Sequence, residues 1–357
     1  MTTGTDGTPS VRGRGHRVRN WFWIVVLLLA LGAGALWAAR SWYLSRPVGV
    51  EIAGVETPEP FHVDAGEGFN SVARRLESRG WIPWSLPIRV EARLGRWDRR
   101  VFPGYYGFRS GETVGGLVER FRRGDIEHVL VTIPEGRRLS QILPVLAEST
   151  WNRVGDFEVL ARDDDWLAEH GIPGPGLEGY VFPETYKIAL GESPERILQQ
   201  VTEPGMKFYA DSLRARAESL GLDQRQVWTL ASIVEAEAVL PEERRRISGV
   251  FWNRYRMGMR LESDPTVLFA LGRAPGRVLY RDLEIDSPYN TYRYAGLPPG
   301  PICQPGRASL RAAVTPLPVR DLFFVARGDG SHVFSKTLAE HNRARSLVRQ
   351  SKKKPSP

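Results

Sequence analysis

Two glutamates near the middle of the chain, Glu235 and Glu237, are the residues best placed to act as a catalytic acid. They end a stretch in which Val227, Ala231 and Val234 recur at the spacing of a helix with one apolar face. Burial against such a face raises the pKa of a carboxyl, and a protonated carboxyl can protonate the leaving oxygen of a glycosidic bond. The residue types are therefore compatible with acid catalysis, for example the cleavage of a glycosidic bond.

The two glutamates cannot both point into one site, because residues two apart on a helix differ by about 200°. Glu235 lies in one helical row with Trp228 and Ala231, which places it at the edge of the buried face. One of the two acids is expected to be a solvated surface residue, and helix geometry alone does not say which. Pro241 and the acids after it then open a second helix, so we expect a helical hairpin.

Stiff, proline-rich loops follow this hairpin and carry tyrosines, amides and acids, which suit sugar recognition by stacking and directed hydrogen bonds. The candidates for substrate contact there are Glu262, Asp264, Tyr289, Asn290 and Tyr292. Before the hairpin, residues 176–188 hold Glu178 and Glu184 among aromatic residues. That segment either lines a sugar cleft or forms an edge strand with two exposed acids.

The composition limits the partners of the chain. Its 357 residues are enough for more than one domain, and its formal net charge of +8 favours an anionic partner: nucleic acid, a membrane surface or an acidic wall polymer. Cys303 is the single cysteine, so there is neither a disulfide framework nor a cysteine-based metal cluster. Its expected role is that of a small buried residue.

The N-terminal region predicts a membrane anchor. Residues 1–20 are rich in Gly, Thr and Arg and are expected to form a disordered basic tail in the cytoplasm. Residues 21–39 contain no charge and approach the roughly 20 residues that span a bilayer, with tryptophans at both ends. A cleaved signal peptide is the alternative, with Ala33 and Ala35 as its A-x-A site. In either case the rest of the chain lies outside the cytoplasmic membrane.

One pattern of a glycine followed by apolar residues at helical spacing occurs three times, in residues 63–76, 108–121 and 133–146. Each copy predicts a strand end, a glycine turn and a helix whose apolar stripe must pack on a small sheet. The pattern resembles LysM, a module that binds N-acetylglucosamine polymers, although a purely architectural role fits it equally. An aromatic-rich helical insertion is expected at residues 81–106.

Taken together, these patterns predict an α+β chain with a single N-terminal transmembrane helix, a small LysM-like α/β region and a mixed α+β catalytic domain. The expected boundaries are a tail at 1–20, a transmembrane helix at 21–43, the LysM-like external region at 44–130, the catalytic domain at 131–345 and a disordered basic tail at 346–357. A strand hairpin is expected near residues 322–334.

Four segments together resemble the endolytic murein transglycosylase family, the YceG-like proteins of bacteria: LASIVEAEA, RMGMRLESDPTV, SPYNTYRYAGLPPGPI and FVARGDGSHVFSKTLAEHN. The resemblance implies an inner-membrane anchor and an external domain that cuts the MurNAc-GlcNAc bond of nascent peptidoglycan, which limits strand elongation. It implies a 1,6-anhydro-MurNAc end, no metal or organic cofactor, and no nucleic-acid partner. Peptidoglycan synthases are candidate partners.

The resemblance assigns the catalytic role to Glu235, because the catalytic glutamate of the family lies in its ASI-x-E segment. It adds Gln304 to the substrate-binding candidates. The chain departs from the family pattern at three positions: Ala236 replaces Lys, Glu262 replaces Gln and Gln304 replaces Asn. The change at Glu262 puts in doubt whether this position donates a hydrogen bond to sugar.

Two other functions remain open at this stage. A non-catalytic wall-binding scaffold would use Glu235 only for packing. A hydrolytic muramidase would use a second acid such as Asp264 or Glu262 to activate water.

Overall fold

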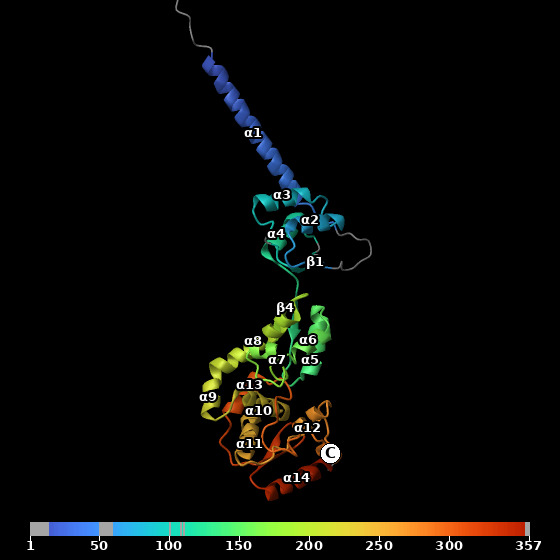
Figure 1. Ribbon diagram of the computed structural model, residues 1–357, viewed down its shortest axis with the longest axis vertical. Helices are drawn as coiled ribbons and strands as arrows, with labels where there is room; N and C mark the ends of the chain where they lie inside the picture. Colours follow the sequence, from blue (N-terminus) through green and yellow to red (C-terminus); the bar gives the residue numbers. More distant parts are fainter. Residues whose placement is uncertain (1–13, 50–59, 100, 108, 110, 354–357) are drawn as a thin grey trace, which may run out of the picture. The chain divides into compact units, whose positions relative to one another are not determined.

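The computed structural model describes residues 14–49, 60–99, 101–107, 109 and 111–353, and it divides the chain into two units (Figure 1). Unit 1 is Met1–Glu127 and unit 2 is His128–Pro357, so the division lies close to residue 130. Within the described residues, helices are combined with three two-stranded antiparallel sheets. The chain is therefore a mixed α+β protein, as the sequence predicts.

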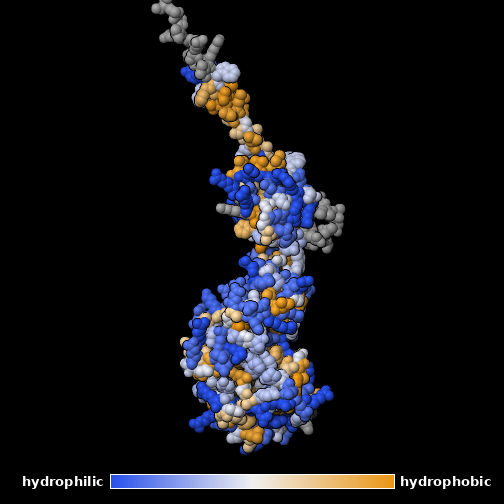
Figure 2. Space-filling model, viewed as in Figure 1, coloured by the Kyte–Doolittle hydropathy of each residue, from blue (hydrophilic) through white to orange (hydrophobic). Residues whose placement is uncertain are grey.

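The chain begins in unit 1 with one long apolar helix, α1 (Arg14–Leu44). Residues 19–44 of this helix are long and apolar enough to cross a membrane, and the side chains of residues 19–42 are exposed (Figure 2). The prediction of a disordered tail up to residue 20 is wrong for residues 14–20, which are helical. Composition alone misses this, because a helix that is already nucleated extends at little cost into its neighbours. Residues 1–13 lie outside the described residues.

The rest of unit 1 is a two-stranded sheet covered by three helices. Strand β1 (Phe61–Val63) pairs with β2 (Gly104–Tyr106) in antiparallel register. The helices are α2 (Phe69–Ser78), α3 (Leu86–Leu94) and α4 (Val114–Arg123). The apolar stripes of α2 and α4 pack on the sheet, and Phe61, Phe69 and Phe121 are fully buried.

The repeated glycine pattern has one backbone form in all three copies. Gly66, Gly111 and Gly136 have φ angles of +80°, +73° and +73°, a conformation that glycine adopts without steric cost. Helices α2, α4 and α5 (Leu139–Thr150) begin three residues after these glycines, as the pattern predicts. The expected helical insertion is only partly correct, because residues 104–106 form β2 instead of helix.

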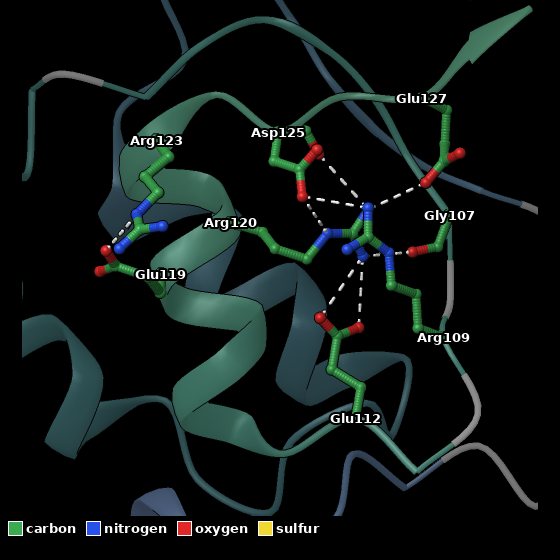
Figure 3. Close-up of polar contacts among 8 residues, drawn as sticks. All are labelled: Gly107, Arg109, Glu112, Glu119, Arg120, Arg123, Asp125 and Glu127. Atoms are coloured by element: carbon green, nitrogen blue, oxygen red, sulfur yellow. Dashed lines mark hydrogen bonds and ion pairs between the residues drawn. The ribbon is translucent and has the colours of Figure 1, made fainter.

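Unit 1 also contains a buried charge, Arg120 of α4, with an exposed fraction of 5% (Figure 3). Its guanidinium lies 3.2 Å from Glu112, 2.9 Å from Glu127 and 3.5 Å from Asp125. It also donates to the carbonyl of Gly107 at 2.7 Å. A buried cation is tolerated only when it is paired in this way, so the cluster ties α4 to the segments before and after it.

Unit 2 contains five helices and two strands before the helix with the paired glutamates, and a helix-rich second half. Strand β3 (His128–Thr132) pairs with β4 (Thr185–Ala189), and β5 (Phe323–Ala326) pairs with β6 (His332–Ser335), which confirms the expected C-terminal hairpin. The helices besides α5 are α6 (Val154–Leu160), α7 (Asp164–Glu169), α8 (Pro194–Ser212), α9 (Arg214–Ser219), α10 (Gln224–Glu237), α11 (Arg244–Arg256), α12 (Asp264–Ala270), α13 (Arg307–Val314) and α14 (Leu338–Lys353), with the 3-10 turns η1 (Pro241–Glu243) and η2 (Tyr280–Glu284).

Helix α10 is the central helix of unit 2 and packs on α11, α12 and α13. It begins at a capping box in which Asp223 accepts from the Gln226 amide while the Gln226 side chain accepts from the Asp223 amide. Its later partners come from far along the chain: Ile302 N donates to Ser232 Oγ across 70 residues of sequence. Helices α10 and α11 form the expected hairpin.

The C-terminal part differs from expectation. Residues 346–353, predicted as part of a disordered tail, continue α14. Ala344 of this helix is buried, and α14 packs on β5 and β6. Tertiary contact of this kind stabilises a helix whose composition is otherwise typical of a solvated tail. Residues 354–357 lie outside the described residues.

Candidate active site

A cavity of about 600 Å³ lies beside the C-terminal end of α10. Its wall is formed by residues 261–264, η2, Tyr292, β5 and α14. One part of the lining is acidic, with Glu237, Glu262 and Asp264. Aromatic and basic side chains complete it, among them Tyr280, Tyr292, Phe323, Phe324, Arg254 and Arg345. Acids together with aromatic rings and cations suit an anionic sugar ligand.

Glu237 is the acid at the base of this cavity. It is the last residue of α10, it is partly buried, and Ser263 Oγ donates a hydrogen bond of 2.6 Å to its carboxylate. Burial is the main cause that raises the pKa of Glu237 to about 7; the hydrogen bond from Ser263 opposes this shift and the charge of Asp264 adds to it. Near neutral pH such a group can both give and take a proton.

Asp264 and Tyr292 form a hydrogen-bonded pair on the same wall. The Tyr292 hydroxyl donates to Asp264 Oδ1 at 2.6 Å, and Asp264 is the first residue of α12. Burial and the neighbouring Asp264 raise the pKa of Tyr292, which keeps its hydroxyl protonated. The carboxylate of Asp264 is exposed and is available to a ligand.

Glu262 is held by a cation. Its side chain lies 2.9 Å from Arg254, which is buried and also donates to the carbonyls of Leu261 and Leu322. The backbone of Glu262 has a φ angle of +53°, a left-handed conformation that is uncommon for a residue with a side chain. The ion pair holds the loop in this conformation, so Glu262 shapes the cavity even where it does not touch a ligand.

Three predicted substrate-contact residues lie away from the cavity. Asn290 is fully buried, donates to the carbonyls of Leu283 and Ile285, and accepts from the Tyr292 amide at 3.0 Å. It therefore positions Tyr292. Tyr289 packs its ring on Phe269 with a centroid distance of 4.8 Å.

Gln304 is the third of these residues and is buried in a polar network. Its Nε2 donates to Glu178 Oε1 at 2.6 Å, and its Oε1 accepts from the Val181 amide. Glu178 also accepts from the Leu139 amide, and burial raises the pKa of Glu178 to about 7. Glu178 is partly buried and does not line the 600 Å³ cavity, so it is neither the cleft residue nor the fully exposed acid that the sequence suggested. Glu184 is exposed.

Glu235 lies in a second polar cluster, on the other side of the end of α10. Its side chain has an exposed fraction of 6%, and Arg244 and the Gly306 amide donate to it at 3.3 and 3.0 Å. Glu135 lies beside Arg244, and burial and the charge of Glu235 raise the pKa of Glu135. A Cβ at Gly306 would be 1.8 Å from Glu135 Oε1, so a larger residue there would displace the Glu135 side chain.

The expectation that one of the two glutamates is a solvated surface acid is therefore wrong. The helix rotation of about 200° is correct, but chain segments cover both sides of the helix end. Residues 261–264 cover Glu237, and Arg244 with Gly306 covers Glu235. Exposure cannot be inferred from helix rotation when later parts of the chain fold back.

Comparison with known proteins identifies the family. The sequence model of the YceG-like family matches residues 61–346. The chain belongs to the YceG-like family.

Similar proteins support this assignment. An endolytic murein transglycosylase of Bacillus subtilis (strain 168) is 34% identical over 270 residues, which cover 70% of this chain and 73% of that protein. A protein of the same name from Streptococcus pneumoniae (strain ATCC BAA-255 / R6) is 24% identical, and the match covers 79% of this chain and 56% of the relative. A crystal structure of a yceG-like protein from Listeria monocytogenes is similar with a TM-score of 0.57 and 30% identity, covering 80% of this chain and 97% of that chain.

The YceG-like match spans the cavity and both glutamates. Sequence analysis missed Ser263 and Arg254, which hold Glu237 and Glu262 in place. Ser263 could have been found from its position in the LESDPT segment, next to Asp264. Arg254 gave no such signal, because it is one of many arginines in the segment after α10. Ala236, the departure between the two acids, is exposed.

Proposed function

We propose that this chain is a membrane-anchored lytic transglycosylase that cleaves the MurNAc-GlcNAc bond within nascent peptidoglycan strands and leaves 1,6-anhydro-MurNAc ends. The names of the two relatives support the substrate. The observation that carries the chemistry is Glu237, a carboxyl with a pKa of about 7 on the wall of a 600 Å³ cavity. Shortening of growing strands would follow from cleavage at internal bonds.

In the proposed reaction, Glu237 first acts as the acid. Its proton passes to the glycosidic oxygen, the bond between that oxygen and C1 of MurNAc breaks, and positive charge develops at C1. The 6-hydroxyl of the same sugar then attacks C1, and its proton returns to the Glu237 carboxylate. The atoms balance without added water, and the enzyme recovers its starting protonation state.

Asp264 and Tyr292 support this step by electrostatics. The exposed carboxylate of Asp264 stabilises the charge that develops at C1, and Tyr292 holds that carboxylate in a fixed position through its hydroxyl. Asn290 in turn fixes the Tyr292 backbone. Arg254 and Arg345 supply positive charge toward the lactyl or peptide carboxylates of the substrate.

We assign the acid to Glu237 rather than to Glu235, although the family resemblance places the catalytic role at Glu235. Glu235 is paired with the cation Arg244 at 3.3 Å and is absent from the lining of the 600 Å³ cavity, whereas Glu237 lines it. Acid catalysis requires a carboxyl that donates a proton into a substrate cavity. Glu235 instead supports the end of α10, and its prediction as the catalytic acid is tested by the same variants.

We further propose that α1 crosses the cytoplasmic membrane once, with the N-terminus inside and unit 2 outside. The apolar span and the arginines that precede it support this orientation. A reporter that is active only in the cytoplasm, fused after residue 60, should be silent. Strong reporter activity there would contradict both the topology and the wall substrate.

The mass of the product tests the reaction. Purified full-length protein in detergent is incubated with uncrosslinked glycan strands, and the released fragments are analysed by mass spectrometry. A lytic reaction gives ends lighter by one water than those of a hydrolase, which would use the nearby Asp264 to activate water. Hydrolysed ends would show that the protein is a hydrolase and not a lyase. If the protein binds the strands but releases no fragments, a scaffold role would be supported. Glu237→Gln serves as the inactive control.

A further inference from the structure

Helix α3 in unit 1 has two apolar faces, although only one of them is buried. Ile88 and Ala92 face the core of the unit and are fully buried. Leu86, Val90 and Leu94 recur every fourth residue, so they form one outward stripe, with exposed fractions of 64%, 48% and 79%. Trp84, two residues before the helix, is 53% exposed. A contiguous exposed apolar stripe of this kind marks an interaction surface.

The stripe lies beside the end of α1. Arg40, the first charged residue after the apolar span, lies 2.6 Å from Glu91 of α3. The ring of Tyr43 stacks on Trp84 with a centroid distance of 6.3 Å, and its hydroxyl donates to the Trp84 carbonyl. These contacts fix α3 at the level where α1 changes from apolar to polar. Tryptophan and tyrosine are enriched at this level of a bilayer.

Basic residues border the other edge of the stripe. Arg89 and Arg93 are one helical turn apart, on the side of α3 opposite to Glu91. Arg89 also lines a polar groove of about 410 Å³ together with Arg74, Arg75 and three small polar residues of α2. A helix with an apolar stripe and arginines along one edge is typical of segments that lie in a membrane surface. The arginines match the phosphates of lipid headgroups in charge.

We propose that α3 lies in the outer surface of the membrane that α1 spans, with Trp84, Leu86, Val90 and Leu94 among the upper parts of the acyl chains. Arg89 and Arg93 then lie at the level of the lipid phosphates. This inference rests on the proposed membrane span of α1. It gives unit 1 two attachments to the bilayer, one through α1 and one through α3, and so fixes its orientation above the surface.

Fluorescence quenching at a single site tests this proposal in the full chain. Cys303 is buried and is replaced by Ser, and one new cysteine carries a fluorophore: Val90→Cys on the stripe, Leu29→Cys in α1, or Val159→Cys, a 69% exposed position in unit 2. The protein is reconstituted in vesicles of phosphatidylethanolamine and phosphatidylglycerol. Lipids with nitroxides at different depths and aqueous iodide serve as the two quenchers.

The expected result is that the Val90 probe is quenched several-fold more by nitroxides near the headgroups than the Val159 probe, and several-fold less by iodide. The Leu29 probe should respond to nitroxides deep in the acyl chains. A Val90 probe that behaves like the Val159 probe overturns the proposal. Protection from iodide without quenching by lipid also overturns it, because another protein surface then covers the stripe. If the Leu29 probe is not quenched by lipid, the membrane span itself is wrong.

A charge in the stripe provides a second test. Leu94→Asp should lower lipid quenching of the Val90 probe several-fold, because a carboxylate is unfavourable among acyl chains. Lipid quenching at Leu29 should remain unchanged, which shows that the span is intact. Val159→Asp is the matched control and should alter neither signal. Unchanged quenching at Val90 in the Leu94→Asp variant contradicts the insertion.

Discussion

Arg120 in unit 1 and Glu237 in unit 2 are both ionisable groups in buried surroundings, yet their environments differ. Arg120 has three carboxylates and two backbone carbonyls around its guanidinium. Glu237 has one hydroxyl as a donor, a second acid nearby and a large cavity in front of it. A buried charge that is paired with several opposite charges holds a structure together, whereas a buried carboxyl without a cation beside a cavity is suited to proton transfer.

The largest expected effect comes from removing the acid. Glu237→Gln keeps the size of the side chain and its contact with Ser263, but it can neither give nor take the proton. Turnover on glycan strands should fall by about 10²- to 10⁴-fold, the range typical of general acid-base groups. Initial rates measured by the release of anhydro ends give this ratio, and circular dichroism checks the fold.

Glu235→Gln is the matched variant on the other side of the same helix end. It should keep most of the activity, because Glu235 has its contacts with Arg244 and Gly306 away from the cavity. An inactive Glu235→Gln beside an active Glu237→Gln would return the catalytic role to the residue that the family resemblance indicates. Two active variants would place the acid elsewhere, with Asp264 the next candidate.

Loss of the Arg120 cluster should lower the stability of unit 1 rather than the catalytic activity. Arg120→Met leaves three carboxylates without their shared cation, so it should destabilise unit 1 by about 3 to 5 kcal/mol. Hydrogen exchange of the α4 amides in the full chain measures the change. Arg122→Met, on the same helix, removes an exposed ion pair with Glu119 and should leave the stability of unit 1 nearly unchanged. Equal effects of the two variants would show that burial does not matter here.

Glu178 tests an acid with a raised pKa that does not line the 600 Å³ cavity. Its pKa of about 7 lies above the ordinary value of 4.5, so the unfolded chain ionises first as the pH rises. The stability that it contributes is complete below pH 4.5 and is lost as the pH rises through 7. Between these limits, wild type should lose on the order of 3 kcal/mol relative to Glu178→Gln.

Chemical denaturation at a series of pH values measures this difference. Glu184→Gln, an exposed position in the same segment, should follow wild type at every pH. A Glu178→Gln variant with the same pH dependence as wild type would contradict the raised pKa.

The smallest effect is expected at Tyr292. Tyr292→Phe removes one hydrogen bond to the Asp264 carboxylate, a loss of about 1.5 kcal/mol that corresponds to roughly a tenfold lower kcat/KM. Tyr294→Phe removes a similar bond to Asp286, outside the cavity lining, and should leave kcat/KM unchanged. Equal losses in the two variants would mean that Tyr292 acts through the loop and not through the reaction.

Features that depend on local pattern could be predicted from the sequence. The apolar span, the three glycine turns and the hairpin of α10 and α11 follow from residue type and spacing over short distances. The acidic candidates Glu262 and Asp264 were also found, because they stand in one short loop segment beside a helix start. The structure places both of them on the cavity wall.

Features that depend on distant contacts could not be predicted. Glu237 is buried only because residues 261–264 fold over the end of α10, and no periodicity in its own helix encodes that cover. Asn290 and Gln304 are residue types that often bind sugars, but here their side chains form hydrogen bonds inside the protein. Residue type therefore predicted sugar contact for both, whereas their position away from the cavity depends on the complete fold.

The long-range partners of α10 also have a consequence for the time course of folding. Ser232 and Glu235 receive hydrogen bonds from amides 70 and 71 residues later in the chain. At a synthesis rate of 5 to 20 residues per second, this separation corresponds to roughly 4 to 14 s during which a newly made α10 lacks α13. Its apolar side chains are open to other partners for that interval. Unit 1 has no such delay, because all its described strands and helices are made before α10. It can therefore fold first and hold the nascent chain in position until unit 2 has folded.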